Sequence, residues 1–372
     1  MSLDNTEVKN NTIKYTTAGG KGLYVGRDSD LNKIEGNTIT ADISPAAPKE
    51  AVTAPGPVNT SSNPGSVAGQ AVLITQTLAA EPTLLNAIIN GKLYQLTVKD
   101  SPSADHDFTE DNTFEGNTIT FTQDAFDGIV LSIAARTIVR NNTVRQAAVA
   151  LRAGIQTGPN GLPKIFPGTC KSDPKRACLS NIDCNILGTS GDTCDSTKPH
   201  SVPVFWVSDS NTIENNNFIG PFNTGVVLAG TNTVVRGNTI SGPLRRADQG
   251  AALTLLGKYS LETTTFTRNV ISDVATVLRL TKEFSNIKAS SFGARISLND
   301  FTSYSIAVSS DIPSTLSVDG RGNYWGLPCP QGFDPAKVQK IGLGVGDLVT
   351  DDHPYGTSVA KVSDGSLPAP CR

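Results

Sequence analysis

The side chains best suited to acid–base chemistry are aspartates that stand just before apolar runs. Asp124 and Asp127 lie in the segment DAFDG, and Asp248 lies in ADQG. A carboxylate can transfer a proton during hydrolysis or elimination when a second catalytic group lies within reach. Two carboxylates in one short turn are, however, more typical of a solvated corner. Asp124 and Asp127 are therefore the catalytic candidates of this chain, but we expect it to have no catalytic site.

Aromatic rings and guanidinium groups beside apolar segments are suited to sugar binding. Sugars stack on aromatic faces and accept hydrogen bonds from arginine. The register of its predicted strand allows Trp206 to face either way. Side chains of this kind are spread along the chain, and any ligand should be sought near one of them: Tyr24, Arg27, Arg152, Trp206 and Arg279.

The residues that commonly bind metals form no known metal-binding pattern. His106, His200 and His353 lie far apart, and the chain has a single Met, which disfavours a copper site. We therefore expect no metal and no cofactor, with calcium as the alternative at one acidic segment. That segment lacks the ligand spacing of a known calcium loop, and its carboxylates are Asp100, Asp105, Asp107, Glu110 and Asp111.

The six cysteines are interpreted as disulfide partners. Cys329 and Cys371 are predicted to join each other and to pin the C-terminal tail, residues 357–372. This use of cysteine predicts an oxidising compartment, so the protein should be secreted, periplasmic or on the cell surface. The other four occur in a polar, turn-rich segment, where three connectivities stay open. Intervening stretches of seven, five and nine residues fit no common zinc pattern for Cys170, Cys178, Cys184 and Cys194.

The elements that would carry these side chains are read from a short repeat. An apolar residue is followed three positions later by Asn, and two positions after that by another apolar residue, as in Ile213, Asn216 and Phe218. From the first copy at Asn11, the copies recur every 22 to 31 residues, apart from two gaps of 80 and 74 residues. Short alternating apolar runs fill each unit, and they favour strands over helices.

A stack of these units predicts an all-β solenoid with three short strands in each coil. Every strand should pair in parallel with its equivalents ~4.8 Å above and below. The repeated Asn should occupy a sharp corner, because Asn and Gly tolerate the left-handed backbone conformation. Stacked in register, the amides should bond to one another. The predicted asparagine ladder comprises Asn37, Asn117, Asn142, Asn216, Asn238, Asn269 and Asn299.

The segments GNTIT, NTIENNNF and GNTIS resemble right-handed parallel β-helix repeats of the pectate-lyase-like superfamily, including NosD-like repeat proteins. The segment GNYWG at 322–326, followed by GVGDLVTDDHPY at 344–355, is similar to the closing coil of secreted bacterial β-helix proteins. The resemblance implies a single-stranded right-handed parallel β-helix over residues 4–356, with a C-terminal cap in which Trp325 plugs the core. This fold hosts many activities, so function has to be argued from a site.

Enzymes that resemble this chain and cleave polysaccharides would place acidic or basic groups on the outer face of one sheet. The NTD, GHG and RIK motifs of polygalacturonases and the DPHE motif of mannuronan epimerases are absent. Asp127 and Asp248 are predicted to lie three coils apart, about 14 Å, whereas glycosidase carboxylate pairs need about 5–9.5 Å. A lyase, which needs only a base and a cation clamp, stays open. The outward strand positions are predicted to be Tyr24, Val130, Ala150, Val227, Ala252 and Ala307.

Two long insertions interrupt the repeat. Residues 42–107 open with a Pro-, Ser- and Gly-rich stretch that should form an extended loop, and a further coil can be hidden in the remainder. Pro82 and Gly91 favour a helix between them, with a hairpin turning at Asn90 and Gly91 as the alternative. The second insertion, residues 154–199, should be stapled by its disulfides.

The composition disfavours several partners. A net charge of −3 provides no basic stripe for nucleic acid. No run of 18 apolar residues exists, so no membrane span is expected. Residues 1–3 (MSL) are interpreted as a cloning remnant before an incomplete natural N-terminus. The protein is expected to be a monomer.

The sequence therefore predicts an exported, non-catalytic β-helix protein with a surface, adhesion or carbohydrate-binding role. Its partner would be a polysaccharide or a cell-surface glycan. The alternative is a polysaccharide lyase or epimerase that acts on an acidic polysaccharide.

Overall fold

The computed structural model describes most of the repeat region and parts of both insertions. It covers residues 4–16, 21–26, 30–42, 70–75, 83–89, 92–98, 109–122, 127–132, 134–146, 149–152, 154–156, 168–172, 177–178, 193–195, 197, 204–206, 208–221, 225–228, 230–242, 251–256, 264–281, 294–310, 318–334, 336, 338–340, 349–351 and 353–371. Within these ranges no helix has the length and hydropathy of a membrane span.

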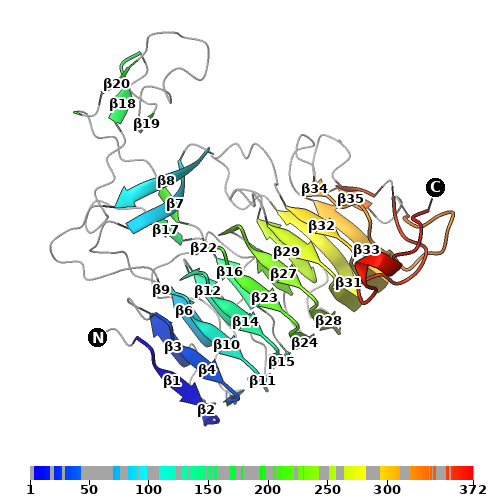
Figure 1. Cartoon of the computed structure of the whole chain (residues 1–372), viewed down its shortest axis with the longest axis horizontal. Helices are drawn as coiled ribbons and strands as arrows, with labels where there is room; N and C mark the ends of the chain where they lie inside the picture. The colour runs from blue at the N-terminus through cyan, green and yellow to red at the C-terminus, as the bar shows by residue number, and fades with distance from the viewer. Residues whose placement is uncertain are drawn as a thin grey trace.

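One long sheet takes one strand from each successive coil, and its strands pair in parallel (Figure 1). The register is regular: Val8 lies beside Ile34, Ile34 beside Phe114, and Phe114 beside Val139. In spatial order the strands are β1 (Glu7–Lys9), β4 (Lys33–Glu35), β10 (Thr113–Glu115), β14 (Ile138–Arg140), β23 (Thr212–Glu214), β27 (Val234–Arg236), β30 (Thr265–Thr267), β32 (Arg295–Ser297), β34 (Val318–Asp319) and β36 (Val349–Thr350).

A second sheet of 15 strands takes two strands from each early coil. The first strands of these coils are β2 (Thr12–Tyr15), β5 (Thr38–Ala41), β11 (Thr118–Phe121), β15 (Thr143–Arg145), β24 (Asn217–Ile219) and β28 (Thr239–Ser241). The second strands are β3 (Lys21–Gly26), β6 (Gln70–Thr75), β12 (Asp127–Ser132), β16 (Val149–Arg152), β25 (Val226–Leu228) and β29 (Leu253–Leu256).

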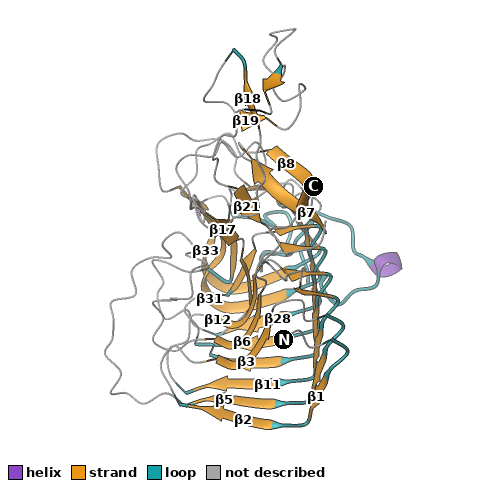
Figure 2. Cartoon of the chain, turned by 90° about the vertical axis from the view of Figure 1, so that its left-hand side faces the viewer, coloured by secondary structure: helices purple, strands orange, loops and turns teal. Residues whose placement is uncertain are grey.

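Toward the C-terminus the two strands of a coil become one. The 12-residue β31 (Val270–Thr281) and the 11-residue β33 (Asp300–Ser310) pair with each other in parallel, and β35 (Val338–Lys340) follows β33. A small parallel sheet bridges four coils through β9 (Thr109–Glu110), β13 (Ala134–Ala135), β22 (Ser208–Asp209) and β26 (Gly230–Thr231). Figure 2 shows strands of the second sheet, among them β2, β5 and β11, stacked as successive rungs. The predicted fold class, a parallel β-helix, is confirmed.

The apolar pair that flanks each repeated Asn forms the centre of the core. Both members of each pair are at most 1% exposed from the second coil to the eighth, as for Phe114 with Ile119 and for Phe266 with Ile271. Burying one such side chain contributes roughly 1.5–3 kcal/mol. The core therefore accounts for the repeat, because each coil covers the apolar side chains of its neighbours.

The first insertion contains strands, and the helix expected after Pro82 is wrong. A hairpin forms instead, with β7 (Thr83–Ile89) antiparallel to β8 (Lys92–Val98). β7 also pairs on its other side with β21 (Val204–Trp206), which pairs with β17 (Gly154–Gln156). A strand with partners on both sides accommodates a near-continuous apolar run, and Asn-Gly is a strong hairpin signal. The insertion also supplies β6, a strand of the second coil.

The second insertion forms a separate three-stranded antiparallel unit. Its strands are β18 (Gly168–Cys170), β19 (Ala177–Cys178) and β20 (Cys194–Asp195), with β18 in the middle. Cys170 and Cys194 are both disulfide-bonded. Cys184 lies outside the described residues, and the side chain of Cys178 is not described.

The C-terminal end of the core is closed by aromatic side chains. Trp325 is 1% exposed and lies 4.6 Å from Phe301 and 4.9 Å from Phe333, measured between ring centroids. Its indole N–H donates to Asp351 over 2.8 Å. A disulfide joins Cys329 to Cys371. The chain after the last coil therefore folds back over the end of the core.

Candidate functional site

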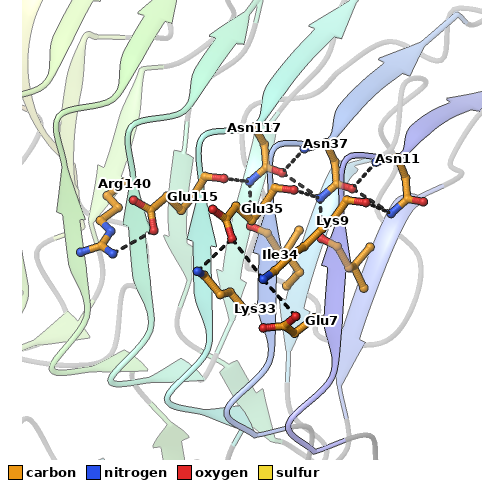
Figure 3. Close-up of polar contacts among 11 residues, drawn as sticks. Glu7, Lys9, Asn11, Lys33, Ile34, Glu35, Asn37, Glu115, Asn117 and Arg140 are labelled. Carbon is orange, nitrogen blue, oxygen red and sulfur yellow. Dashed lines mark hydrogen bonds and ion pairs between the residues drawn. The ribbon is translucent and has the colours of Figure 1, made fainter.

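A column of asparagine side chains runs the length of the β-helix. In each step, the Oδ1 atom of one Asn accepts the backbone N–H and the side-chain Nδ2 of the Asn in the preceding coil, over 2.8–3.1 Å. Figure 3 shows the first three members. The full column is Asn11, Asn37, Asn117, Asn142, Asn216, Asn238, Asn269, Asn299 and Asn323.

The column is a structural feature and leaves no group free for a ligand in its middle. Asn238 accepts two hydrogen bonds from Asn216 and donates to Asn269 and to the carbonyl of Ile213. It is 0% exposed. Since a buried amide is costly unless it is fully hydrogen-bonded, each Asn depends on both neighbouring coils.

The left-handed corner lies one residue earlier than predicted. The ladder asparagines do not have positive φ; the residues just before them do, with φ between 55° and 78°. Gly237 is one of these residues, and a Cβ there would lie 2.4 Å from Oδ1 of Asn215. The positions are occupied by Asn10, Gly36, Gly116, Asn141, Asn215, Gly237, Arg268, Leu298 and Gly322.

A second buried polar row lies five residues before the ladder and was not predicted. The backbone N–H of Asn32 donates to Oδ1 of Asn112 over 3.1 Å, and that of Thr137 donates to Oδ1 of Asn211 over 3.0 Å. The sequence shows this row as a polar residue five positions before each ladder asparagine from Asn37 to Asn269. That residue is Asn in some coils and Thr in others, so the row does not repeat as one residue type. The row comprises Asn32, Asn112, Thr137, Asn211, Thr233 and Thr264.

The outer face beside the ladder carries charges that neutralise one another (Figure 3). Arg140 pairs with Glu115 at 2.8 Å, and Arg236 pairs with Glu214 at 2.6 Å. The hydrogen bond from Arg140 holds the pKa of Glu115 below its ordinary value. Lys33 lowers the pKa of Glu35 in the same way. These carboxylates are ionised partners, so they are poor general acids.

On the other side of the corner lies a strip of hydroxyl groups, which we call the hydroxyl face. It consists of the outward positions of β2, β5, β11, β15, β24 and β28, which are aligned by the parallel register. Its inner row is Thr12, Thr38, Thr118, Thr143, Asn217 and Thr239. Its outer row is Lys14, Thr40, Thr120, Arg145, Ile219 and Ser241.

Three threonines in the first coils of this face, Thr12, Thr38 and Thr118, are exposed. None of their hydroxyls makes a hydrogen bond with another described residue. Arg145 is exposed and has no ion pair within the described part of the chain. Neighbouring strands lie ~4.8 Å apart, so the groups repeat at a fixed spacing along the axis. This arrangement can form many hydrogen bonds to an extended polar chain.

The sequence-based ligand candidates lie on different parts of the second sheet or outside it. Tyr24 and Arg279 occupy equivalent positions, in one register row, on different strands of the second sheet. Successive strand pairing connects these positions through Leu73, Val130 and the equivalent residues of three further strands. Six strand steps separate them, about 29 Å at ~4.8 Å per step, so they do not form one site. Arg152 lies in β16, two positions beyond that row. Arg27 lies outside the described residues.

The position of Trp206 is set by the insertions. It lies in β21, and its backbone pairs with Gly154, two residues after Arg152. The backbone segments that carry Trp206 and Arg152 are therefore close, although their sequence numbers differ by more than 50. The side chains of Tyr24, Arg152 and Trp206 are not described.

The predicted outward positions need two corrections. Ala252 and Ala307 are both 0% exposed and belong to the core. The register places Thr254 and Ser309 in the outward row instead. Val130 does lie in that row, but it is only 2% exposed. This part of the sheet is therefore not an open ligand surface.

The catalytic and calcium candidates form no described site. Asp124 and Asp248 lie outside the described residues, and Asp127 begins β12 without a described side chain. Glu110 and Asp111 both pair with Arg136, which occupies their oxygens. Asp100, Asp105, Asp107, His106 and His200 lie outside the described ranges. Within those ranges no group of three His, Cys, Asp or Glu side chains is placed to hold a metal.

Comparisons with known proteins concern the fold. No protein-family model matches the sequence, and no curated protein matches it. An alginate lyase from Paenibacillus sp. str. FPU-7 is 10% identical, with a TM-score of 0.43, over 91% of this chain and 79% of that one. A double-mutant tailspike protein of E. coli bacteriophage HK620, in complex with a pentasaccharide, is 10% identical, with a TM-score of 0.26, over 87% of this chain and 58% of that one.

Proposed function

We propose that this protein is an exported, non-catalytic β-helix that binds carbohydrate, as a monomer, in a surface or adhesion role. The observation that carries the proposal is the hydroxyl face. Thr12, Thr38 and Thr118 present hydroxyls at one fixed spacing, and within the described residues neither these hydroxyls nor the guanidinium of Arg145 has a partner. A polysaccharide or cell-surface glycan lying along the axis would present hydroxyl groups to it strand after strand.

The state of the described carboxylates supports a binding role over catalysis. Glu35, Glu115 and Asp42 have pKa values lowered by cationic partners, which disfavours proton donation. Asp351 is the carboxylate in the described ranges with a raised pKa, but it lies buried against Trp325 and Asn323. A general acid or base must reach its substrate, and Asp351 does not.

Export is supported by the cysteine chemistry. Cys329 and Cys371 are oxidised, and Cys170 and Cys194 are also in disulfides. Disulfides persist in oxidising compartments, and small polar segments such as residues 168–197 need them because they bury little apolar surface.

The test is binding and cleavage on a polysaccharide panel, with paired threonine substitutions. Thr118→Val with Thr143→Val should weaken binding on the order of tenfold, because each change removes a hydroxyl and keeps the branched side chain that strands favour. Arg145→Gln should weaken binding of any acidic glycan. Thr113→Val with Thr212→Val, on the first sheet, is the matched control and should leave binding unchanged.

Two results would overturn the proposal. Equal losses in the test and control pairs would show that the hydroxyl face is not the binding surface. Depolymerisation of an acidic polysaccharide by the purified protein would favour the lyase or epimerase alternative.

A further inference from the structure

The last residues of the chain form a strap over the C-terminal end of the hydroxyl face. We define the strap as residues 358–364. It contacts Asp300, whose register position continues the inner row of that face through Val270 and Thr239. Figure 1 shows the C-terminal segment beside β31 and β33, and Figure 2 shows the short 3-10 helix η2 (Asp364–Ser366) standing away from the stacked strands.

The first attachment of the strap is a carboxylate. Asp300 follows Val270 and Thr239 in the register row, and it is 5% exposed. Its Oδ1 accepts the backbone N–H groups of Val359, over 2.7 Å, and Ala360, over 3.1 Å. Its Oδ2 accepts the hydroxyl of Ser358. Val359 is 0% exposed, so this end of the strap is packed as well as hydrogen-bonded.

The second attachment is Arg268, one of the left-handed corner residues. Its guanidinium donates to the carbonyl oxygens of Ala360 and Val362 and pairs with Asp364. The Asp364 side chain is 86% exposed, so the ion pair is open to solvent and contributes little. Beyond Ala360 the strap is therefore held weakly by non-covalent contacts.

The third attachment is covalent and holds the far end. Cys371 is 5% exposed, and it is joined to Cys329, a residue at the surface. Between the strap and Cys371, residues 365 and 366 are exposed. The disulfide closes the segment from Cys329 to Cys371, which contains the strap, into a loop.

We propose that the strap is a redox-releasable cover on the C-terminal end of the hydroxyl face. While the disulfide is intact, the strap occupies Asp300 and ends the inner row at that coil. When the disulfide is reduced, residues 358–371 are no longer closed into a loop and leave the β-helix, which uncovers Asp300 and the neighbouring outward positions of β31. The inference does not depend on glycan binding, because release of the strap can be measured directly.

The chemistry requires a dithiol reductant, and its electrons balance. One reductant thiolate attacks the accessible sulfur of Cys329, and the buried sulfur of Cys371 leaves as a thiolate that takes up a proton. The second reductant thiol then attacks the mixed disulfide and frees Cys329 as a thiol. Two electrons pass to the protein, and the reductant ends as a disulfide.

The experiment is hydrogen exchange on the full chain, before and after treatment with dithiothreitol. The amides of Val359 and Ala360 should exchange about tenfold faster or more after reduction, because their hydrogen bonds to Asp300 then belong to a fraying end. The ladder amides of Asn216 and Asn238 should keep their protection. Dithiothreitol also reaches other disulfides, so the double variant Cys329→Ser with Cys371→Ser, without reductant, isolates this one and should behave like the reduced protein.

Each alternative outcome counts against the proposal. Unchanged exchange at Val359 and Ala360 in the double variant would show that Asp300 and Arg268 hold the strap unaided. Faster exchange at Asn216 and Asn238 as well would show that the disulfide stabilises the whole β-helix and that the strap is no separate unit.

Discussion

The carboxylate of Asp351 stands where a tenth ladder asparagine would stand. The backbone N–H of Asn323, the last asparagine, donates to Oδ2 of Asp351 over 3.0 Å, as each earlier ladder residue donates to the next Asn. The same carboxylate also accepts the N–H of Gly322 over 2.9 Å and the indole N–H of Trp325 over 2.8 Å. One side chain thus ends the ladder and fixes the tryptophan that closes the core.

Asp351→Ala should destabilise the protein strongly. The change leaves the donors of Asn323, Gly322 and Trp325 without their acceptor, and a buried unsatisfied donor costs about 1–3 kcal/mol. We expect the free energy of unfolding, measured with urea, to fall by about 3 kcal/mol or more. The control is Asp364→Ala, whose side chain is 86% exposed. It should change stability by less than about 0.5 kcal/mol, and a similar loss in both variants would contradict the capping role.

The same residue predicts a pH dependence with a definite sign. Burial raises the pKa of Asp351 above its ordinary value of 3.8, although hydrogen bonds from Asn323, Gly322 and Trp325 oppose the rise. The folded state therefore binds this proton more tightly than the unfolded state does. The resulting stabilisation is fully present below the unfolded pKa and is lost as pH rises through the folded pKa.

This dependence can be isolated by comparing the native chain with Asp351→Asn, which cannot ionise. The native chain should lose stability relative to the variant as pH rises from below 3.8 toward neutrality. The carboxylates with lowered pKa, such as Glu115, titrate equally in both proteins and cancel. A flat difference across this pH range would show that Asp351 does not titrate abnormally.

Asn216→Ala should break the ladder at its middle. Asn142 would lose the acceptor of its backbone N–H and of its side-chain amide, and the carbonyl of Val139 would lose a donor. We expect a loss of about 3–5 kcal/mol in the free energy of unfolding, since several buried groups lose partners together. Asn217→Ala, at the neighbouring half-exposed position, should cost less than about 1 kcal/mol. If the two variants unfold at the same denaturant concentration, the ladder does not stabilise the fold in the way proposed.

Leu31→Gly should stabilise the protein. Leu31 has φ 57° and is 56% exposed, so it combines a left-handed backbone with an exposed apolar side chain. A residue with a Cβ pays about 1–2 kcal/mol in this conformation, and Gly does not. After the greater chain entropy of unfolded Gly is subtracted, we expect a gain of about 0.5–1 kcal/mol. Leu31→Ala keeps the Cβ and should give no gain; an equal gain there would point to the removed side chain instead.

The parts of the fold that could be predicted are those that repeat. The trio Ile213, Asn216 and Phe218 recurs with one spacing because every coil meets the same corner and the same core. The row of Asn32 and Asn211 was missed, since Thr137 and Thr233 fill the same position in other coils. Asn112 and Thr137 both donate a side-chain hydrogen bond to the carbonyl two residues earlier, so one local role is filled by two residue types.

Features that occur only once in the chain could not be predicted from the repeat. Asp351 has no counterpart in another coil, and its role appears only when the chain returns to the end of the ladder. The outward positions of the second strand were predicted wrongly, because the number of residues between the two strands of a coil varies. Ala252 comes after a gap between β28 and β29, whereas Ala307 lies inside the unbroken strand β33. The hydroxyl face is visible in the sequence as the recurring Thr38 and Thr118, but the sequence-based candidates lie mostly on the second strand of each coil.

The ladder also has an electrical polarity. From Asn37 to Asn299, each side-chain carbonyl oxygen points toward the preceding coil, and one side-chain N–H donates to the Asn of the following coil. These amides also donate to backbone carbonyls of the preceding coil, as Asn238 does to Ile213. Their dipoles therefore add along the axis, with the positive end at Asn323, and each hydrogen bond polarises the next. An anion is favoured at such an end, as it is at the start of an α-helix. At Asp351 the hydrogen bonds from this end of the ladder favour the ionised carboxylate, and burial, which raises its pKa, opposes them.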